Sequence, residues 1–411
     1  GVLSDRRSEI PTKQRRTKMK KLLVLAMVLV FAAMPMFAEV SIGGEFDYYM
    51  VNGFKAQDGA EDHFADNWDK GEVDFKATVG DYSKVLIELE EDGSWNKRGE
   101  GKYAEGTPSF NYFRVQTDWG KFFGLEGIGI KSDIGLNSWE TFDNVDFTGY
   151  NYENADNFDN PDLDKDFGFK LSLSFVDGLI QPYYAMVFDT TKNDATDDAY
   201  QLLAGVGVDF KAVDIPLWIE AYFEKKEAKK VNLFGVEAMY DLAISDFDIK
   251  LGGFFQNESN KDNDRGSWYG FGAQFNAFGA TIDASFAGAF GEDYWGEDNF
   301  SPFSVLGVSA QYFFLEWLGI NAGCNFAFGD YKENVAGDKA LQGFEAGVIA
   351  KPDKGVCYKL GYIYCDEDVS GSKGYFFRTL NTKKVTAYKG GLYFVTKIDA
   401  KGKYLVTSRT Q

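Results

Sequence analysis

The chain has 411 residues and a formal charge of −20 at pH 7. This excess of acidic groups excludes a nucleic-acid-binding function, because the phosphate backbone would repel a chain of negative charge. The negative charge does not suit docking on an anionic membrane surface either. Aromatic residues make up 17% of the chain, with 38 Phe and 23 Tyr. A composition so rich in Phe and Tyr favours β-strands.

A secretory signal is predicted near the start of the chain. Met19–Lys21 form a short basic segment, Leu22–Ala33 is an apolar run of twelve residues, and Ala38 offers a small residue for cleavage. This order is typical of a signal peptide, and the run is shorter than the about 20 residues of a transmembrane helix. We therefore expect an extension at 1–18 and a signal peptide at 19–38, with a short membrane anchor as the alternative.

Apolar and polar residues alternate in segment after segment from Val40 to Ile398. In Phe167–Phe175, for example, the odd-numbered residues are apolar and the even-numbered ones are Gly, Lys or Ser. Alternation with period two predicts strands with one apolar face. The polar faces are mostly small and uncharged, which suits a water-filled lumen, while the apolar faces suit lipid. Such a sequence can span a bilayer only as a closed barrel, and a soluble β-sandwich or solenoid is the alternative.

Short and long connections alternate along the chain. Turns such as Gly80–Asp81 and Ala277–Gly279 are short. The longer polar links are 52–69, 91–109, 132–166, 190–199, 258–267, 292–302, 330–340 and 366–384. A barrel with tight periplasmic turns and long outer loops predicts this alternation. We therefore expect an all-β fold, a transmembrane antiparallel β-barrel of about 16–18 strands at 39–398, followed by a tail at 399–411.

This organisation resembles that of the bacterial outer-membrane porin superfamily over residues 40–398. Alternate residues of Tyr388–Phe394 share one face and look like the aromatic-ended closing strand of such barrels, although this chain continues to Gln411. The resemblance implies a general-diffusion or sugar-porin-like channel in the outer membrane of a diderm bacterium. It also implies outer-membrane lipid around the barrel, a homotrimer as one assembly of such proteins, and no cofactor.

The same resemblance implies a constriction inside the barrel. The longest link, 132–166, follows the fifth strand-like segment, where porins of this type place a loop that folds into the lumen. Its acidic residues are Glu140, Asp143, Asp146, Glu153, Asp156, Asp159, Asp162, Asp164 and Asp166. The polar faces of segments two, three and four carry Lys76, Lys84 and Arg114. In the family a basic cluster on the early strands faces an acidic inner loop, so we expect these two sets to form the constriction.

The sequence offers little support for catalysis or a metal site. His63 is the single His, and DHFADNW (62–68) provides no Ser or Cys nucleophile beside it, so no catalytic arrangement is predicted. The acids of DLDKD (162–166) alternate as in a calcium loop, but the turn Gly and the closing Glu of an EF-hand are absent. We expect a solvated acidic loop there, with divalent-ion binding as the alternative.

Trp218 is a candidate aromatic residue of the lumen. Glu220 and Tyr222 share its face in the period-two pattern, so sugar stacking is one interpretation and a place in the interfacial aromatic girdle is the other. Taken together, the residues and the resemblance predict a porin through which small hydrophilic solutes and ions diffuse, with a preference for cations because acids line its mouth. The alternative is an outer-membrane surface protein for adhesion or antigenic display, in which pore activity is incidental. An enzyme is not predicted.

Overall fold

The computed structural model describes a set of ranges along the chain: 39–56, 64–92, 109–137, 163, 166–188, 200–226, 231–244, 247–259, 265–290, 304–328, 340–353, 355–365, 388–399 and 404–406. The expected extension at 1–18 and signal peptide at 19–38 lie outside these residues, as does His63. Among the described residues no helix is both long enough and apolar enough to cross a membrane.

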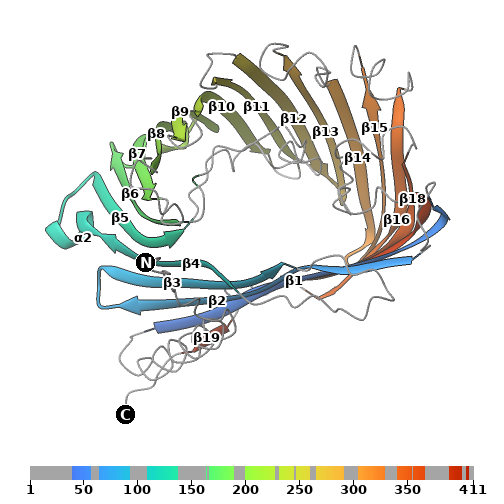
Figure 1. Ribbon diagram of the computed structural model, residues 1–411, viewed down its shortest axis with the longest axis horizontal. Coiled ribbons are helices and arrows are strands. Elements are labelled where there is room, and N and C mark those ends of the chain that lie inside the picture. Colours follow the sequence, from blue (N-terminus) through green and yellow to red (C-terminus); the bar gives the residue numbers. More distant parts are fainter. Residues whose placement is uncertain are drawn as a thin grey trace, which may run out of the picture.

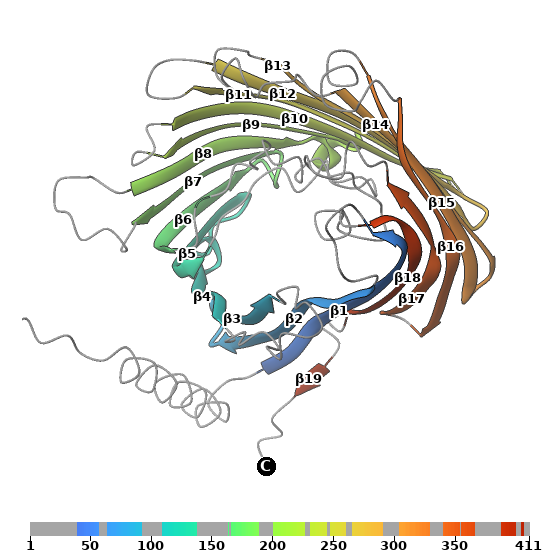
Figure 2. The ribbon, with the colours of Figure 1, turned by 45° about the vertical axis from the view of Figure 1, so that its right-hand side comes forward.

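Antiparallel strands form one continuous sheet that curls into a ring (Figures 1 and 2). Each strand from β1 to β17 pairs with the next strand in the chain, and β18 (Tyr388–Asp399) returns to pair with β1 (Glu39–Ala56). Residues 45–56 of β1 take part in that last pairing. Each of the eighteen strands therefore has a partner on both sides, which is how a barrel avoids exposed strand edges. The expected antiparallel barrel of 16–18 strands is confirmed, at the upper end of that range.

The other strands follow in chain order. They are β2 (Phe64–Val79), β3 (Ser83–Asp92), β4 (Ser109–Asp118), β5 (Ile128–Asn137), β6 (Asp166–Phe175), β7 (Ile180–Phe188), β8 (Tyr200–Asp209), β9 (Leu217–Lys226), β10 (Val231–Ile244), β11 (Phe247–Ser259), β12 (Arg265–Ala277), β13 (Ala280–Phe290), β14 (Ser304–Leu315), β15 (Leu318–Ala327), β16 (Leu341–Asp353) and β17 (Val356–Cys365). The shortest, β7, has nine residues. Since a tilted strand of about 9–11 residues crosses a bilayer, every strand of the ring is long enough.

Long and short connections alternate around the ring, as expected from the sequence. Those that follow even-numbered strands are short: 80–82, 119–127, 176–179, 210–216, 245–246, 278–279, 316–317 and 354–355. Those that follow odd-numbered strands include all the longest: 93–108, 138–165, 189–199, 291–303, 328–340 and 366–387. The short turns therefore gather at one end of the ring, as in barrels whose periplasmic turns are tight.

Three of the predicted links are too long. The link predicted at 132–166 begins only at 138, because β5 continues to Asn137. Within that stretch Ile134 is 51% exposed and Asp133 only 5%, which is the alternation of a strand. The links predicted at 52–69 and 258–267 likewise shrink to 57–63 and 260–264. A strand face that lines a lumen carries polar residues and glycines, so its composition resembles that of a loop.

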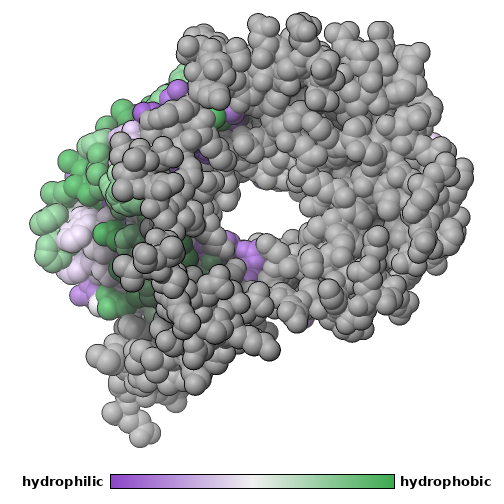
Figure 3. All heavy atoms as spheres, in the orientation of Figure 1, coloured by the Kyte–Doolittle hydropathy of each residue, from purple (hydrophilic) through white to green (hydrophobic). Residues whose placement is uncertain are grey.

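The two faces of the ring differ in polarity. Large apolar residues that alternate with the polar set are exposed on the outer face of almost every strand, among them Val73, Phe113, Ile134, Phe167, Leu171, Val206, Phe223, Phe234, Leu251, Phe271, Ile282, Tyr312, Ile320, Val348 and Leu360. Figure 3 shows hydrophobic residues on the outer side near β5 and hydrophilic residues beside a central opening. An apolar outer face and a polar inner face are the pattern of a membrane-spanning barrel.

The connection between β4 and β5 holds a short helix, α2 (Trp119–Phe123). Asp118 caps the helix by accepting a hydrogen bond from the backbone N–H of Lys121 at 2.9 Å. The rings of Trp119, Phe122 and Phe123 contact one another, with centroids 5.0–6.2 Å apart, and all three are exposed. Aromatic side chains at the ends of membrane-spanning strands suit the lipid–water interface.

The closing strand is β18, which contains the aromatic-ended segment Tyr388–Phe394. The chain then forms one more short strand, β19 (Tyr404–Val406), within the segment expected as a tail. β19 pairs with Val40–Ile42 of β1, beyond the stretch of β1 that pairs with β18. Residues 395–399 and 404–406 thus pair along the same edge of β1.

Candidate functional site

Three basic side chains lie on adjacent strands of the inner face. Lys76 is on β2, Lys84 on β3 and Arg114 on β4. In the register, Lys76 and Arg114 lie opposite Leu86 of β3, one on each side, and Lys84 is two residues from Leu86 on the same face. The lysines are exposed and Arg114 is half-buried. The sequence-derived set therefore gathers on one part of the wall, called here the basic patch (Lys76, Lys84, Arg114).

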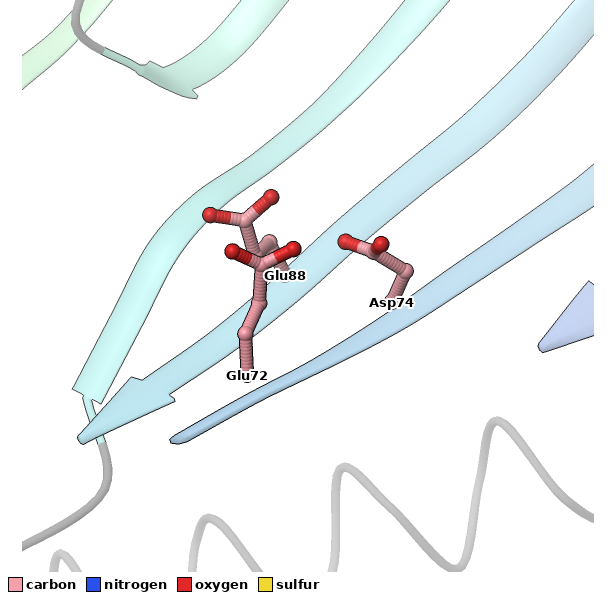
Figure 4. Close-up of side chains that lie close together, drawn as sticks. All are labelled: Glu72, Asp74 and Glu88. Carbon is pink, nitrogen blue, oxygen red and sulfur yellow. The ribbon is translucent and has the colours of Figure 1, made fainter. Parts of the chain in front are cut away.

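An acidic group lies on the same wall, farther from the short turns. Glu72, Asp74 and Glu88 each offer a carboxylate oxygen, and these oxygens lie within 4.8 Å of one another. Asp74 is directly opposite Glu88 in the β2–β3 register, and Figure 4 shows the three carboxylates on one side of these strands. Glu72 and Glu88 are buried. Like charges opposite each other destabilise a sheet unless other groups offset them.

Polar neighbours connect this acidic group (Glu72, Asp74, Glu88) to the basic patch. The side-chain amide of Asn111 donates to Glu88 Oε1 at 2.6 Å, and the Tyr112 hydroxyl donates to Asp74 Oδ1 at 3.5 Å. The guanidinium carbon of Arg114 lies 5.0 Å from the centroid of the Tyr112 ring. Tyr112 thus stands between the positive and the negative part of the wall.

The sequence interpretation did not single out the acidic group. The period-two pattern that identified the basic patch also places these acids on the polar face, since Glu72 and Asp74 alternate with Val73, and Glu88 alternates with Leu89. What the sequence does not state is the register. The turn at 80–82 brings Asp74 opposite Glu88, and only then do separate acidic residues become one group.

A second set of carboxylates lines the part of the wall formed by β9–β11. Its members are buried: Glu220, Glu224, Glu237 and Glu258. Glu220 lies directly opposite Glu237 in the register and accepts a hydrogen bond from the Tyr183 hydroxyl. Lys226 Nζ lies 3.3 Å from Glu224 Oε1, so this acid has a charged partner. In the ring, β9–β11 lie across the lumen from β2 and β3 (Figure 2).

Elsewhere on the inner face, carboxylates accept hydrogen bonds from neutral side chains of the neighbouring strand. Asp133 accepts from Gln116 at 3.1 Å, and Glu345 accepts from Asn321 at 3.1 Å. Asp283 accepts from Gln274 at 2.7 Å and from Ser309 at 3.0 Å. A neutral donor stabilises a buried carboxylate without cancelling its charge. These contacts can hold the inner wall in place without adding positive charge to it.

The comparisons with known proteins bear on the fold. No protein-family model and no curated protein sequence matches the chain. A BenF-like porin from Pseudomonas fluorescens Pf-5 matches in structure with a TM-score of 0.55 and 10% identity, covering 90% of this chain and 98% of that one. The fold is that of a bacterial outer-membrane porin. Two further structures are similar. OccAB3 of Acinetobacter baumannii has a TM-score of 0.55 and 9% identity, and the match covers 90% of this chain and 99% of that one. OccK9 (OpdG) of Pseudomonas aeruginosa has a TM-score of 0.54 and 10% identity, and the match covers 90% of this chain and 98% of that one.

The acidic loop expected inside this porin fold falls mostly outside the described residues. Eight of its nine acids lie outside those residues, namely Glu140, Asp143, Asp146, Glu153, Asp156, Asp159, Asp162 and Asp164. Asp166 is the first residue of β6 and pairs with Asn137 in the register, so it belongs to the wall. Leu163, which the structure does describe, is fully buried. The connection 138–165 follows β5 and is the longest in the chain.

Trp218 lies on the inner face of β9, as do Glu220 and Tyr222. Its indole nitrogen is buried and has no hydrogen-bond partner among the residues that the structure describes. The ring lies over Gly207 of β8, where an added Cβ would come within 3.0 Å of two ring carbons. Trp218 therefore lies along the wall of the porin barrel. Tyr222 is only 2% exposed, so its ring does not offer an open face for stacking.

Proposed function

We propose that the chain forms a passive diffusion pore in the outer membrane of a diderm bacterium. Small hydrophilic solutes and ions cross through its lumen, and cations are preferred. The observation that carries the proposal is a closed ring of eighteen strands whose outer face is apolar and whose inner face holds carboxylates. A water-filled lumen inside a lipid-facing ring is a route for polar solutes across the bilayer.

The cation preference follows from the charges of the wall. The acidic group on β2–β3 and the carboxylates of β9–β11 lie on opposite sides of the lumen. Facing walls of one sign, backed by low-dielectric lipid, concentrate counter-ions in the lumen. The whole chain supports the same sign, since residues 1–38 hold eight of the 43 Lys/Arg and two of the 63 Asp/Glu, and the rest carries −26.

The constriction is part of this proposal. The connection 138–165 would fold into the lumen and bring some of its acids toward the basic patch. Opposed acidic and basic groups create a field across the pore, which orients polar solutes and hinders apolar ones. Each ion pair there would be hydrated and contribute about 0–1 kcal/mol. The constriction would therefore affect transport far more than stability.

The test is single-channel recording of refolded protein in a planar bilayer. In a KCl gradient the reversal potential should show cation preference, and the preference should grow as the salt concentration falls, because the Debye length rises from about 10 Å at 0.1 M to about 30 Å at 0.01 M. Anion preference would refute the charge argument. A folded, inserted protein that conducts nothing would refute the pore and favour the alternative, a surface protein for adhesion or antigenic display.

A further inference from the structure

A row of polar and basic residues crosses the outer face of β9–β12 at the end away from the short turns. Lys225 of β9 is directly opposite Asn232 of β10, and Asn232 is opposite Ser259 of β11. Ser259 is in turn opposite Arg265, the first residue of β12. The four positions lie where β9 and β11 end and where β10 and β12 begin, whereas the short turns follow β10 and β12. This outer row (Lys225, Asn232, Ser259, Arg265) contains two basic residues and no acid.

The side chain of Lys225 lies on the outer side of the wall. Its neighbours in the chain, Glu224 and Lys226, form an ion pair on the inner face, and both are buried. Lys225 instead contacts Tyr200 of β8. Its Nζ donates a hydrogen bond to the Tyr200 hydroxyl at 3.2 Å and lies 5.5 Å from the centroid of that ring. Tyr200 is directly opposite Phe188, which is 45% exposed on the outer face. Lys225 is therefore a cation on the face that the lipid would cover.

The apolar outer surface begins next to the outer row. Phe223 and Phe234 are directly opposite each other, and each is two residues closer to the middle of its strand than Lys225 or Asn232. Their side chains are 40% and 52% exposed. Two residues of a strand span about 7 Å, so the polar row and the exposed rings are close enough to contact one molecule. That molecule would have a polar head and apolar chains.

The polar groups of the row suit a phosphate head. Lys225 supplies an ammonium group, which binds phosphate as a point charge. The Tyr200 hydroxyl accepts the hydrogen bond from Lys225, so its own proton can be donated to an oxygen of a ligand. Asn232 is exposed beside Lys225, and its amide offers further donors. A phosphate ester has negative charge and several acceptor oxygens, which match a cation surrounded by neutral donors.

We propose that the outer row, centred on Lys225, binds the phosphate-bearing headgroup of a lipid in the outer leaflet, whose acyl chains lie on Phe223 and Phe234. This inference rests on the proposed function, which places the end away from the short turns at the outer surface of the membrane. The chain as a whole carries −20 and does not suit anionic lipid, and the outer row is a local exception to that charge. The row is also continuous with the lipid-facing surface, which identifies a lipid rather than a free phosphate ion.

The experiment is a titration of detergent-refolded protein with lipid A, a diphosphorylated glycolipid, followed by native mass spectrometry. Lys225→Gln should weaken binding roughly fivefold, because one basic residue at an anionic membrane surface contributes about 1 kcal/mol. Lys225→Arg should retain most of the affinity, since it keeps the charge. Tyr200→Phe should lose less than Lys225→Gln, since it removes one neutral donor.

The matched control is Lys121→Gln. Lys121 lies in α2 at the short-turn end, and its side chain is 72% exposed. This variant also removes one exposed positive charge, but from the opposite end of the barrel, so lipid A should bind it as it binds the unaltered protein. An equal loss in Lys121→Gln and Lys225→Gln would mean that net charge alone governs binding, and the site would be refuted.

Two further titrations identify the group that is bound. Lipid A from which both phosphates have been removed should bind the unaltered protein and Lys225→Gln alike, because the lysine then has no phosphate to contact. Inorganic phosphate at the same concentrations should not displace lipid A. If inorganic phosphate displaces the lipid from the unaltered protein but not from Lys225→Gln, the row takes a free anion and the assignment to a lipid is overturned.

The outcomes separate this inference from the proposed pore. Because Lys225 lies on the outer face, Lys225→Gln should leave single-channel conductance in phosphatidylcholine bilayers unchanged. If the unaltered protein inserts but does not conduct, the pore fails, and the lipid titration still decides the site. If the protein conducts and its affinity for lipid A does not depend on Lys225, the pore stands and the lipid site is refuted. Folding is checked by gel mobility on heating, and Lys225→Met, which keeps an apolar stem, tests the same loss of charge if Lys225→Gln does not fold.

Discussion

Two neighbouring residues of β6 allow the orientation of the barrel wall to be tested by one substitution at each. Leu171 lies in the middle of the strand, faces outward and is 38% exposed. Ser172 faces inward, opposite Lys131 of β5 and Tyr183 of β7. Arg placed at 171 would enter the hydrocarbon of the membrane, whereas Arg placed at 172 would enter the water of the lumen.

The magnitudes differ because the two surroundings differ. A lipid-facing Arg near the midplane costs a membrane barrel about 2–4 kcal/mol, so Leu171→Arg should lower the folding equilibrium constant by roughly 30- to 700-fold, at about 1.4 kcal/mol per tenfold. For Ser172→Arg the loss of folding free energy comes from electrostatic repulsion between the new Arg and Lys131. Because both groups are hydrated in the lumen, we expect this loss to be about 0–1 kcal/mol.

The assay is equilibrium unfolding by guanidinium in phosphatidylcholine vesicles, followed by tryptophan fluorescence. Leu171→Arg should shift the midpoint to much lower denaturant than Ser172→Arg, with the unaltered protein as reference. Leu171→Ala serves as the control for the loss of apolar area alone. Equal losses of stability in the two Arg variants, or a larger loss of stability in Ser172→Arg, would contradict the assignment of the outer and inner faces. Either result would also contradict a ring that spans the membrane.

Three further predictions concern transport. Neutralising the basic patch, by Gln at all three positions, should strengthen cation preference in a KCl gradient without unfolding the barrel, and unchanged reversal potentials would place the patch away from the ion path. Neutralising the acidic group, by Gln or Asn, should weaken cation preference, most clearly at low salt; a stronger preference would reverse its assigned role. Deleting 143–162 should raise conductance and admit larger sugars in liposome swelling, whereas an unaltered size cut-off would mean that the connection lies outside the lumen.

The strands and their order were predictable because a membrane barrel leaves a simple record in the sequence. In β6 every second residue from Phe167 is apolar, since it must face lipid, and the residues between are small or polar, since they face water. The alternation of short and long connections was predictable for a related reason. Hairpins at the turn end need only a few residues, as at 278–279, while the other end is free to vary.

Features that depend on register and on packing were not predictable from the pattern. The acidic group exists because β2 and β3 pair so that Asp74 meets Glu88, and a shift of one residue would have sent every side chain of one strand to the other face. In the same way, the alternation around Trp218 gave its face but not its orientation. That the ring lies on Gly207 depends on a glycine of another strand, eleven positions earlier in the chain.

The inner wall has to satisfy two demands that usually conflict. A carboxylate buried in a protein wall must be hydrogen-bonded, and the strongest partner is a Lys or Arg. In the proposed cation-preferring pore, such a partner would cancel the negative charge that attracts cations. Asp283, with 0% exposure, receives hydrogen bonds from the Gln274 amide and the Ser309 hydroxyl, one on each side. Neutral donors on both neighbouring strands hold three strands together through this carboxyl group, so these contacts stabilise the wall without adding positive charge to the lumen of the proposed cation-preferring pore.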